Sequence, residues 1–185
     1  MYTGSNSNES YIYTVDTQRR HLKSIIKNSE IRIDSALNEL RKLNLHYDSL
    51  LNIVDSLPLG SPLDTLEISS DYGWRRSPFN VGWQMHAGTD YMAAWHDTVY
   101  ATGAGIISKS NWIGGYGRCI IIEHAWGYES KYAHLYKYFV KKGDTVYKGQ
   151  AIARAGNSGA VTGPHLHYEV RRNGKTTNPE TFMLD

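Results

Sequence analysis

The sequence has little cysteine and no excess of charge of one sign. Cys119 is the single cysteine among 185 residues, so the chain can form neither an internal disulfide nor a zinc site built from thiolate pairs. Lysine and arginine number 20 against 18 aspartate and glutamate, for a formal net charge of +2. We therefore expect no nucleic-acid partner. Because there are eight histidines, any metal would rest on imidazole and carboxylate groups.

Long apolar runs are also missing. No run approaches the ~18 apolar residues that a membrane-spanning helix requires. Residues 1–10 contain neither the basic region nor the apolar core of a secretory signal. As it stands, the sequence predicts a soluble chain without an export signal.

Glycine, leucine and tryptophan divide the chain into two parts. Fifteen of 17 glycines lie from Gly73 onward, eleven of 14 leucines precede residue 67, and all five tryptophans follow it. Leucine-rich sequence that is poor in glycine favours helix, whereas sequence rich in glycine, tryptophan and tyrosine favours strands and turns. We expect a flexible lead at 1–14, a helical segment at 15–57, a linker at 58–67 and a mainly β domain at 68–185.

Apolar residues recur in alternating steps of four and three from Leu22 to Leu57. Ten of these eleven positions are apolar or aromatic, which is the a/d pattern of about five heptads. Pro58 ends the pattern, because proline cannot continue the helical hydrogen-bond ladder. Residues 22–57 would either form a coiled coil, with a second copy or a partner protein, or pack their apolar stripe on the second half.

The second half contains short apolar runs separated by glycine-rich turns. Several short strands at this spacing predict an antiparallel β domain. The expected strands are Thr98–Tyr100, Gly105–Lys109, Cys119–His124, Tyr128–Leu135, Ala151–Ala155 and His165–Arg171.

Two histidines, His165 and His167, are separated by one apolar residue. On a strand, positions i and i+2 point to the same face, so both imidazoles would emerge together while Leu166 turns into a core. Two imidazoles aimed at one place suit a metal site or an acid/base pair. The same pattern also occurs on strands whose histidines are only exposed or hydrogen-bonded.

His86 and Asp90 form a second candidate pair, four residues apart. On a helix they would share a face, but Gly88 between them favours a bend that enters a strand. Either geometry brings a nitrogen and an oxygen to one ion. His134 lies in a further apolar run, where a strand would turn it to the same face as Tyr132 and Tyr136.

Taken together, these segments resemble the lysostaphin/LytM-type zinc endopeptidases. The resemblance runs from about residue 68 to Leu184, in one order and with similar spacing. It rests on Asp71-Tyr72-Gly73-Trp74-Arg75, His86-x-x-x-Asp90, Gly114-Gly115-Tyr116-Gly117, Tyr132-Ala133-His134-Leu135, Gly143-Asp144-x-Val146-x-x-Gly149-Gln150, Gly156-Asn157-Ser158-Gly159, Thr162-Gly163-Pro164-His165-Leu166-His167 and Asn178-Pro179.

The resemblance implies a LytM-type domain, with a duplicated hybrid motif of antiparallel strands and one zinc ion per chain. His86, Asp90 and His167 would be the zinc ligands, and three protein ligands leave a position open, as in catalytic zinc sites. His134 and His165 would be the catalytic acid/base groups. His165 would take the proton of water and His134 would act at the tetrahedral stage, although this division stays open. The other four histidines, His21, His46, His96 and His124, match no site position.

The resemblance further implies a substrate: the stem peptides of bacterial peptidoglycan, cut at a D-alanyl–diaminopimelate cross-link in the cell envelope. One alternative is a phage virion enzyme with the same chemistry. Another is a non-catalytic activator of a different hydrolase, but such proteins lack zinc ligands and this sequence has all five site residues. Residues 94–98 lack the Pro and Gly usual in the family. The helical segment would dimerise, dock a partner or inhibit the site.

Overall fold

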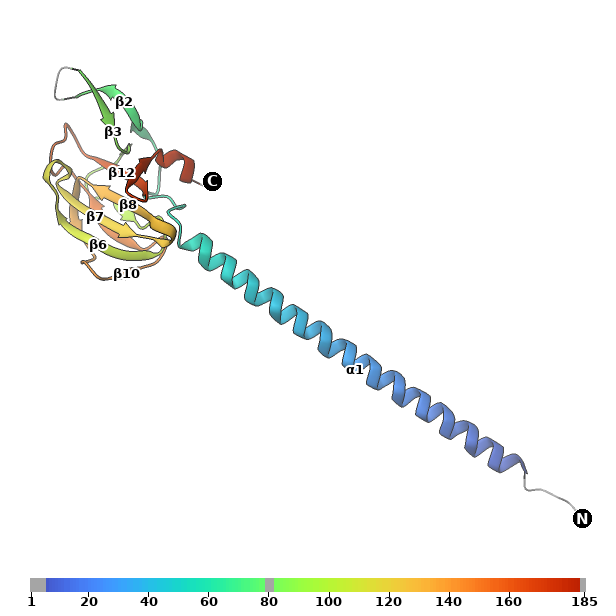
Figure 1. Ribbon diagram of the computed structural model, residues 1–185. Helices are drawn as coiled ribbons and strands as arrows, with labels where there is room; N and C mark the ends of the chain where they lie inside the picture. The colour runs from blue at the N-terminus through green and yellow to red at the C-terminus, as the bar shows by residue number, and fades with distance from the viewer. Residues whose placement is uncertain (1–5, 79–81, 184–185) are drawn as a thin grey trace, which may run out of the picture. The chain divides into compact units, whose positions relative to one another are not determined.

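The computed structural model describes residues 6–78 and 82–183 (Figure 1). The chain divides into two compact units, Met1–Leu50 and Leu51–Asp185. Residues 1–5 of the expected flexible lead lie outside the described residues. Within the described residues, no helix combines the length and apolar character needed to cross a lipid bilayer.

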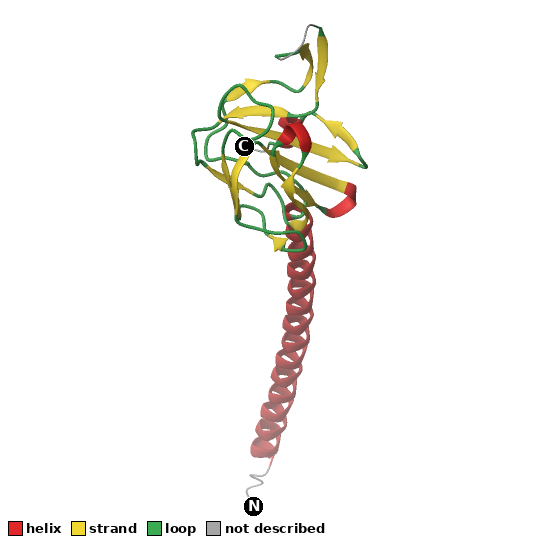
Figure 2. Cartoon of the chain, turned by 90° about the vertical axis from the view of Figure 1, so that its left-hand side faces the viewer, coloured by secondary structure: helices red, strands yellow, loops and turns green. Residues whose placement is uncertain are grey.

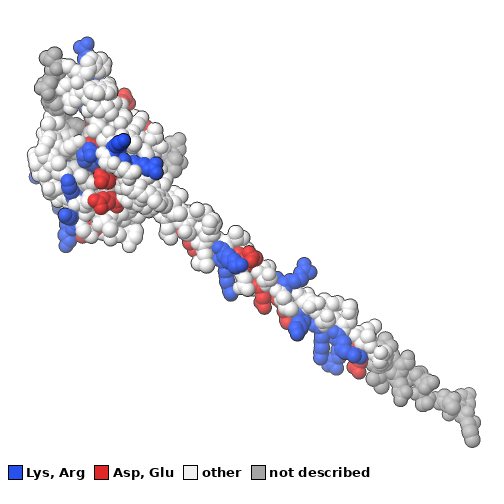
Figure 3. Space-filling view, viewed as in Figure 1, with Lys and Arg blue, Asp and Glu red and all other residues white. Residues whose placement is uncertain are grey.

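One long helix, α1, runs from Asn6 to Asp55. It begins earlier than the expected residue 15, because no glycine or proline interrupts the sequence between Gly4 and Pro58. It ends just before Pro58, whose ring disfavours helical conformation in the preceding residue. On the face seen in Figure 3, basic and acidic side chains are interspersed along the helix.

The apolar seam of α1 is exposed in the single chain. Its residues Leu22, Ile26, Ile33, Leu40 and Leu43 are between 56% and 63% exposed. An apolar stripe of this length is normally covered by a partner helix or by a core. Coiled-coil pairing through residues 22–57 therefore stays a prediction.

The main sheet of the second unit has eight antiparallel strands, in the order β1-β4-β12-β8-β7-β6-β10, with β13 also paired to β12 (Figure 1). The strand β12 lies inside the sheet, so residues of β4 and β8 flank its side chains. The strands are β1 (Ile68–Ser70), β4 (Thr89–Met92), β6 (Gly105–Trp112), β7 (Arg118–Glu123), β8 (Tyr128–Ala133), β10 (Thr145–Val146), β12 (His165–Arg172) and β13 (Lys175–Thr177).

Two smaller sheets accompany the main one (Figure 2). One has three strands in the order β5-β11-β9, and the other is a hairpin of β2 and β3. The mainly β, antiparallel fold is thus confirmed, although the sequence did not predict the β2–β3 hairpin. The strands are β2 (Gly73–Arg76), β3 (Trp83–His86), β5 (Thr98–Tyr100), β9 (Leu135–Tyr138) and β11 (Ala151–Ala155), and the 3-10 turns are η1 (Gly114–Tyr116), η2 (Ala125–Gly127) and η3 (Pro179–Phe182).

The core of the β unit is built from alternate residues of its strands. Along β12, Leu166, Tyr168 and Val170 are fully buried, as the alternation predicted. The buried tyrosine hydroxyls are satisfied, because Tyr132 and Tyr168 both lie within 2.9 Å of the Thr102 hydroxyl. The opposite face of β12 is therefore free to carry polar side chains.

Candidate metal centre

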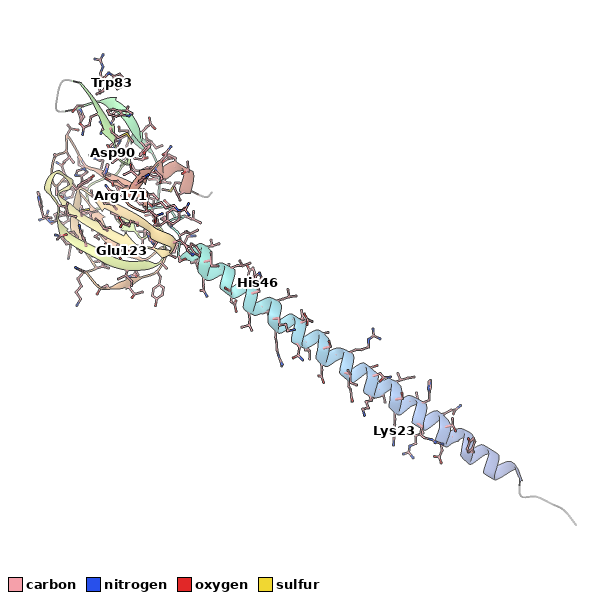
Figure 4. All side chains as sticks on the ribbon, viewed as in Figure 1. Lys23, His46, Trp83, Asp90, Glu123 and Arg171 are labelled. Atoms are coloured by element: carbon pink, nitrogen blue, oxygen red, sulfur yellow. The ribbon has the colours of Figure 1, made fainter. Side chains whose placement is uncertain are left out.

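Three candidate ligands meet because of the register of the sheet. His86 is the last residue of β3, and Asp90 is the second residue of β4. The strand β4 pairs with β12 so that Asp90 lies directly opposite His167. Between His86 and Asp90 the chain bends at Gly88, where a Cβ would collide with the carbonyl oxygen of Tyr168. Asp90 lies on the main sheet, on the side that faces the β2–β3 hairpin (Figure 4).

The donor atoms of these residues form a small triangle. His86 Nε2 lies 3.1 Å from Asp90 Oδ1 and 3.1 Å from His167 Nδ1, and His167 Nδ1 lies 2.7 Å from Asp90 Oδ1. All three residues are buried. Ligands at 2.0–2.1 Å from a tetrahedral zinc are about 3.3 Å apart. The triangle therefore has the size and chemistry of a zinc site.

The outer nitrogen of each imidazole is held by an acceptor. The Nδ1 of His86 lies 2.7 Å from the carbonyl oxygen of Asp71, and the Nε2 of His167 lies 3.2 Å from Glu169 Oε1. Because these oxygens only accept, each outer nitrogen carries the proton and the inner nitrogen has its lone pair free. His86 thus presents Nε2 and His167 presents Nδ1, and the two lone pairs face the Asp90 carboxylate. Such an arrangement is favourable when a cation lies between them.

Glu169, which is fully buried, contacts His167 and three further side chains. It lies 2.6 Å from the hydroxyl of Tyr116, 2.8 Å from Arg171 Nε and 3.1 Å from Lys131 Nζ. Burial alone would raise the pKa of Glu169, but the bond from His167 and the charge of Lys131 outweigh it and lower the pKa. A permanent negative charge therefore fixes the orientation of His167.

The same balance holds at Asp90. Burial would raise its pKa, but the neighbouring imidazoles of His167 and His86 outweigh burial and lower it. Arg75 on β2 adds a positive charge, with Nη2 at 3.6 Å from Asp90 Oδ2. Asp90 is thus a carboxylate at neutral pH, which is the form that binds a metal.

His134 and His165 lie beside the triangle, 4.8 Å apart between ring centroids. The Nδ1 of His134 lies 2.8 Å from the carbonyl oxygen of Ser158, and the Nδ1 of His165 lies 2.9 Å from that of Gly163. Each Nδ1 therefore carries the proton and leaves the Nε2 lone pair free. The Nε2 of His165 lies 3.8 Å from Asp90 Oδ1, so it faces the donor triangle.

The expectation that His134 lies on one continuous strand was wrong. The strand predicted at Tyr128–Leu135 breaks into β8 and β9 at His134, which has a φ of 61°. This left-handed residue turns the chain, so Tyr132 is fully buried and Tyr136 is exposed instead of sharing a face. Backbone strain of this kind is typical of functional sites.

Burial lowers the pKa of His134 to about 4. The bond to Ser158 opposes this effect, and the neighbouring His165 and His167 reinforce it. The imidazole is therefore neutral at pH 7 and can accept a proton at Nε2.

All five predicted site residues line one cleft in the described part of the chain. The structure brings them together from β3, β4, β12 and the β8–β9 junction, and Arg75 and Tyr116 also line the cleft. Sequence reasoning missed Glu169 and the carbonyls of Asp71 and Ser158. Glu169 had a signal, because it follows His167 by two residues on the same face of the strand. The carbonyl contacts had none.

Comparisons with known proteins match the part of the chain that carries this site. The model of peptidase family M23 matches residues 84–179, which include all five residues. Peptidoglycan DD-endopeptidase ShyC of Vibrio cholerae is 39% identical over 140 residues, which cover 75% of this chain and 32% of that protein. The chain thus spans about a third of the length of the curated relatives it matches.

Two solved structures are also similar. A zinc-containing peptidase from Vibrio cholerae has a TM-score of 0.61 and 35% identity, over 67% of this chain and 39% of that one. The catalytic domain of the antimicrobial peptidase lysostaphin from Staphylococcus simulans has a TM-score of 0.57 and 32% identity, over 63% of this chain and 91% of that one.

Proposed function

The chain belongs to peptidase family M23, and from this premise we propose that it is a zinc endopeptidase of bacterial peptidoglycan. It would hydrolyse peptide cross-links, with D-alanyl–diaminopimelate as the bond, because its relative ShyC is named a DD-endopeptidase. The observation that carries the proposal is the donor triangle with two free imidazole nitrogens beside it. The reaction would take place in the bacterial cell envelope.

We assign one zinc ion to His86 Nε2, Asp90 and His167 Nδ1. When bound, zinc supplies Lewis acidity, which lowers the pKa of water toward ~7 and polarises a carbonyl. The side chains determine where this happens, because the carbonyl of Asp71 and the carboxylate of Glu169 hold the imidazoles in place. A catalytic site needs this rigidity, since small misplacements of reacting groups slow reactions strongly.

His165 and His134 handle the protons in this proposal. His165 accepts the proton of the attacking water at Nε2, because its Nδ1 is already bonded to Gly163. His134 starts neutral, so its Nε2 can receive this proton from His165, whose ring centroid lies 4.8 Å away. It then stabilises the tetrahedral stage and passes the proton to the leaving amine.

An intact-sacculus digest tests the proposal. Purified full-length protein is incubated with diaminopimelate-containing sacculi, before and after zinc removal and zinc readdition, and the products are identified by mass spectrometry. We expect zinc-dependent release of monomeric muropeptides from cross-linked dimers. His86→Ala should abolish release, whereas His46→Ala on the exposed face of α1 should not. Equal release by the zinc-free protein would contradict the mechanism.

The same digest separates the alternative roles of the chain. A non-catalytic activator would release nothing alone but would accelerate another hydrolase. Products cut at glycine bridges, rather than at D-alanyl–diaminopimelate bonds, would overturn the proposed cross-link and leave the zinc chemistry intact. The presence of all five site residues in one cleft supports the enzyme.

A further inference from the structure

Three aromatic side chains form a surface cluster outside the donor triangle. The rings of His96 and Tyr136 are stacked, with centroids 4.3 Å apart and planes 20° from parallel. Trp95 lies 5.8 Å from His96 and 5.7 Å from Tyr136. Trp95 is nevertheless 50% exposed and Tyr136 42% exposed. We call this cluster of Trp95, His96 and Tyr136 the aromatic platform.

The backbone of the platform is strained and firmly held. His96 has a φ of 78°, a left-handed backbone conformation that residues other than glycine rarely adopt. Its amide donates to the carbonyl of Ala155, the amide of Ala155 donates back to the carbonyl of Asp97, and Arg154 donates to the carbonyl of His96. These bonds fix the loop without help from the rings. An ordered, strained residue with an exposed ring is typical of a ligand-binding position.

The platform adjoins the catalytic cleft. A second hollow shares Ser69, Thr162 and His165 with that cleft and continues to Ala94 and Asp97, the two residues that flank Trp95 and His96. On the other side, Gly156 pairs with His165, and the backbone of Tyr136 packs against Gly156. A substrate that occupies the cleft and extends through the second hollow therefore comes next to the loop that carries Trp95 and His96.

We propose that the aromatic platform binds a sugar ring of the peptidoglycan glycan strand while the stem peptide lies in the cleft. The inference rests on the proposed function. The D-alanyl and diaminopimelyl groups of the cross-link are small or charged, so the sugar is the part of this substrate with a large apolar C–H face. Such a face stacks on an exposed aromatic ring, and the ring's polar edges tolerate the hydroxyls.

Two substrates test the platform in the full-length, zinc-loaded protein. One is intact sacculi, and the other is a synthetic cross-linked peptide dimer that carries no sugar. Trp95→Ala and Tyr136→Ala should slow cleavage of sacculi about three- to tenfold and leave cleavage of the dimer unchanged. Trp95→Tyr should retain most activity on sacculi.

Trp126→Ala is the matched control. Trp126 is 54% exposed, and its backbone is left-handed, as that of His96 is. It lies in η2, before the start of β8, whereas His134 follows the end of that strand. The Trp126→Ala protein should cleave both substrates at the rate of the unchanged protein. Equal rates of Trp95→Ala and the unchanged protein on sacculi would overturn the proposal, and so would an equal slowing on both substrates.

A binding measurement keeps the inference separate from the proposed function. Peptide-free glycan strands are titrated into the zinc-free protein by calorimetry. The unchanged protein should bind them, and Trp95→Ala should weaken binding about three- to tenfold. Such binding, together with no cleavage of either substrate by the zinc-loaded protein, would refute the endopeptidase and keep the platform. No binding, or binding independent of Trp95, would refute the platform itself.

Discussion

The donor triangle and the proposed acid/base pair lie side by side but are held in different ways. His86, Asp90 and His167 belong to strands, and the pairing of β4 with β12 sets the distance between two of them. His134 lies between strands and His165 begins one, and each is oriented by a carbonyl of the segment 158–163. The geometry of the proposed metal site thus depends on sheet register, whereas the geometry of the proposed acid/base pair depends on one loop.

The largest contrast is expected between Asp90→Ala and His134→Ala. Removing Asp90 deletes the only carboxylate of the triangle, so the protein should lose stoichiometric zinc and all activity. Removing His134 should leave zinc content unchanged and lower kcat by about 10²–10⁴. Elemental analysis and muropeptide release measure the two effects. Loss of zinc in His134→Ala would erase the distinction between the two groups.

A second contrast concerns the residues that orient each group. Glu169→Gln tests the residue that orients His167 in the donor triangle. Glutamine keeps the volume and one acceptor but removes the charge that holds His167 and pairs with Lys131. We expect zinc affinity to fall about 10- to 100-fold, measured by competition with a chelator. Glu123→Gln, an exposed carboxylate on β7, should leave the affinity unchanged. Unaltered zinc affinity in Glu169→Gln would show that the charge plays no part in the metal site.

Ser158→Ala is the corresponding test for the proposed acid/base pair. The Ser158 hydroxyl donates to the carbonyl of Leu135 and accepts the amide of Arg118, so it anchors the loop that orients His134. Its loss should lower kcat about tenfold, with zinc affinity unchanged. The control is Ser110→Ala, whose hydroxyl also bonds a backbone carbonyl, that of Val140 on another segment. A fall in zinc affinity would show that the loop also supports the triangle.

The sequence predicted those features of the site that depend on local spacing. Alternation along one strand placed His165 and His167 on the face opposite Leu166, and the structure agrees. The sequence did not predict the left-handed turn at His134, because that turn is imposed by tertiary contacts, among them the bond from the His134 amide to the carbonyl of Tyr116. It also missed the Asp71 contact, which depends on the pairing of β2 with β3. Long-range pairing supplies what spacing alone cannot.

The smallest expected effect concerns His124, a half-buried histidine outside both groups. Its Nδ1 lies 2.8 Å from the carbonyl oxygen of Ala104 and its Nε2 lies 2.7 Å from the Ser130 hydroxyl. Burial lowers its pKa below the ordinary value of 6.5, so the unfolded chain takes up a proton at His124 at a higher pH than the folded chain does.

Stability from His124 is therefore complete above pH 6.5 and declines as the pH falls below it. Melting temperatures of zinc-free protein at pH 7, 6 and 5 should fall less steeply in His124→Gln than in the unchanged chain. His46→Ala, on the exposed surface of α1, should reproduce the unchanged slope. Identical slopes for His124→Gln and the unchanged chain would mean that protonation of His124 does not destabilise the folded chain. In that case, burial would not lower the pKa of this imidazole, which contradicts the prediction.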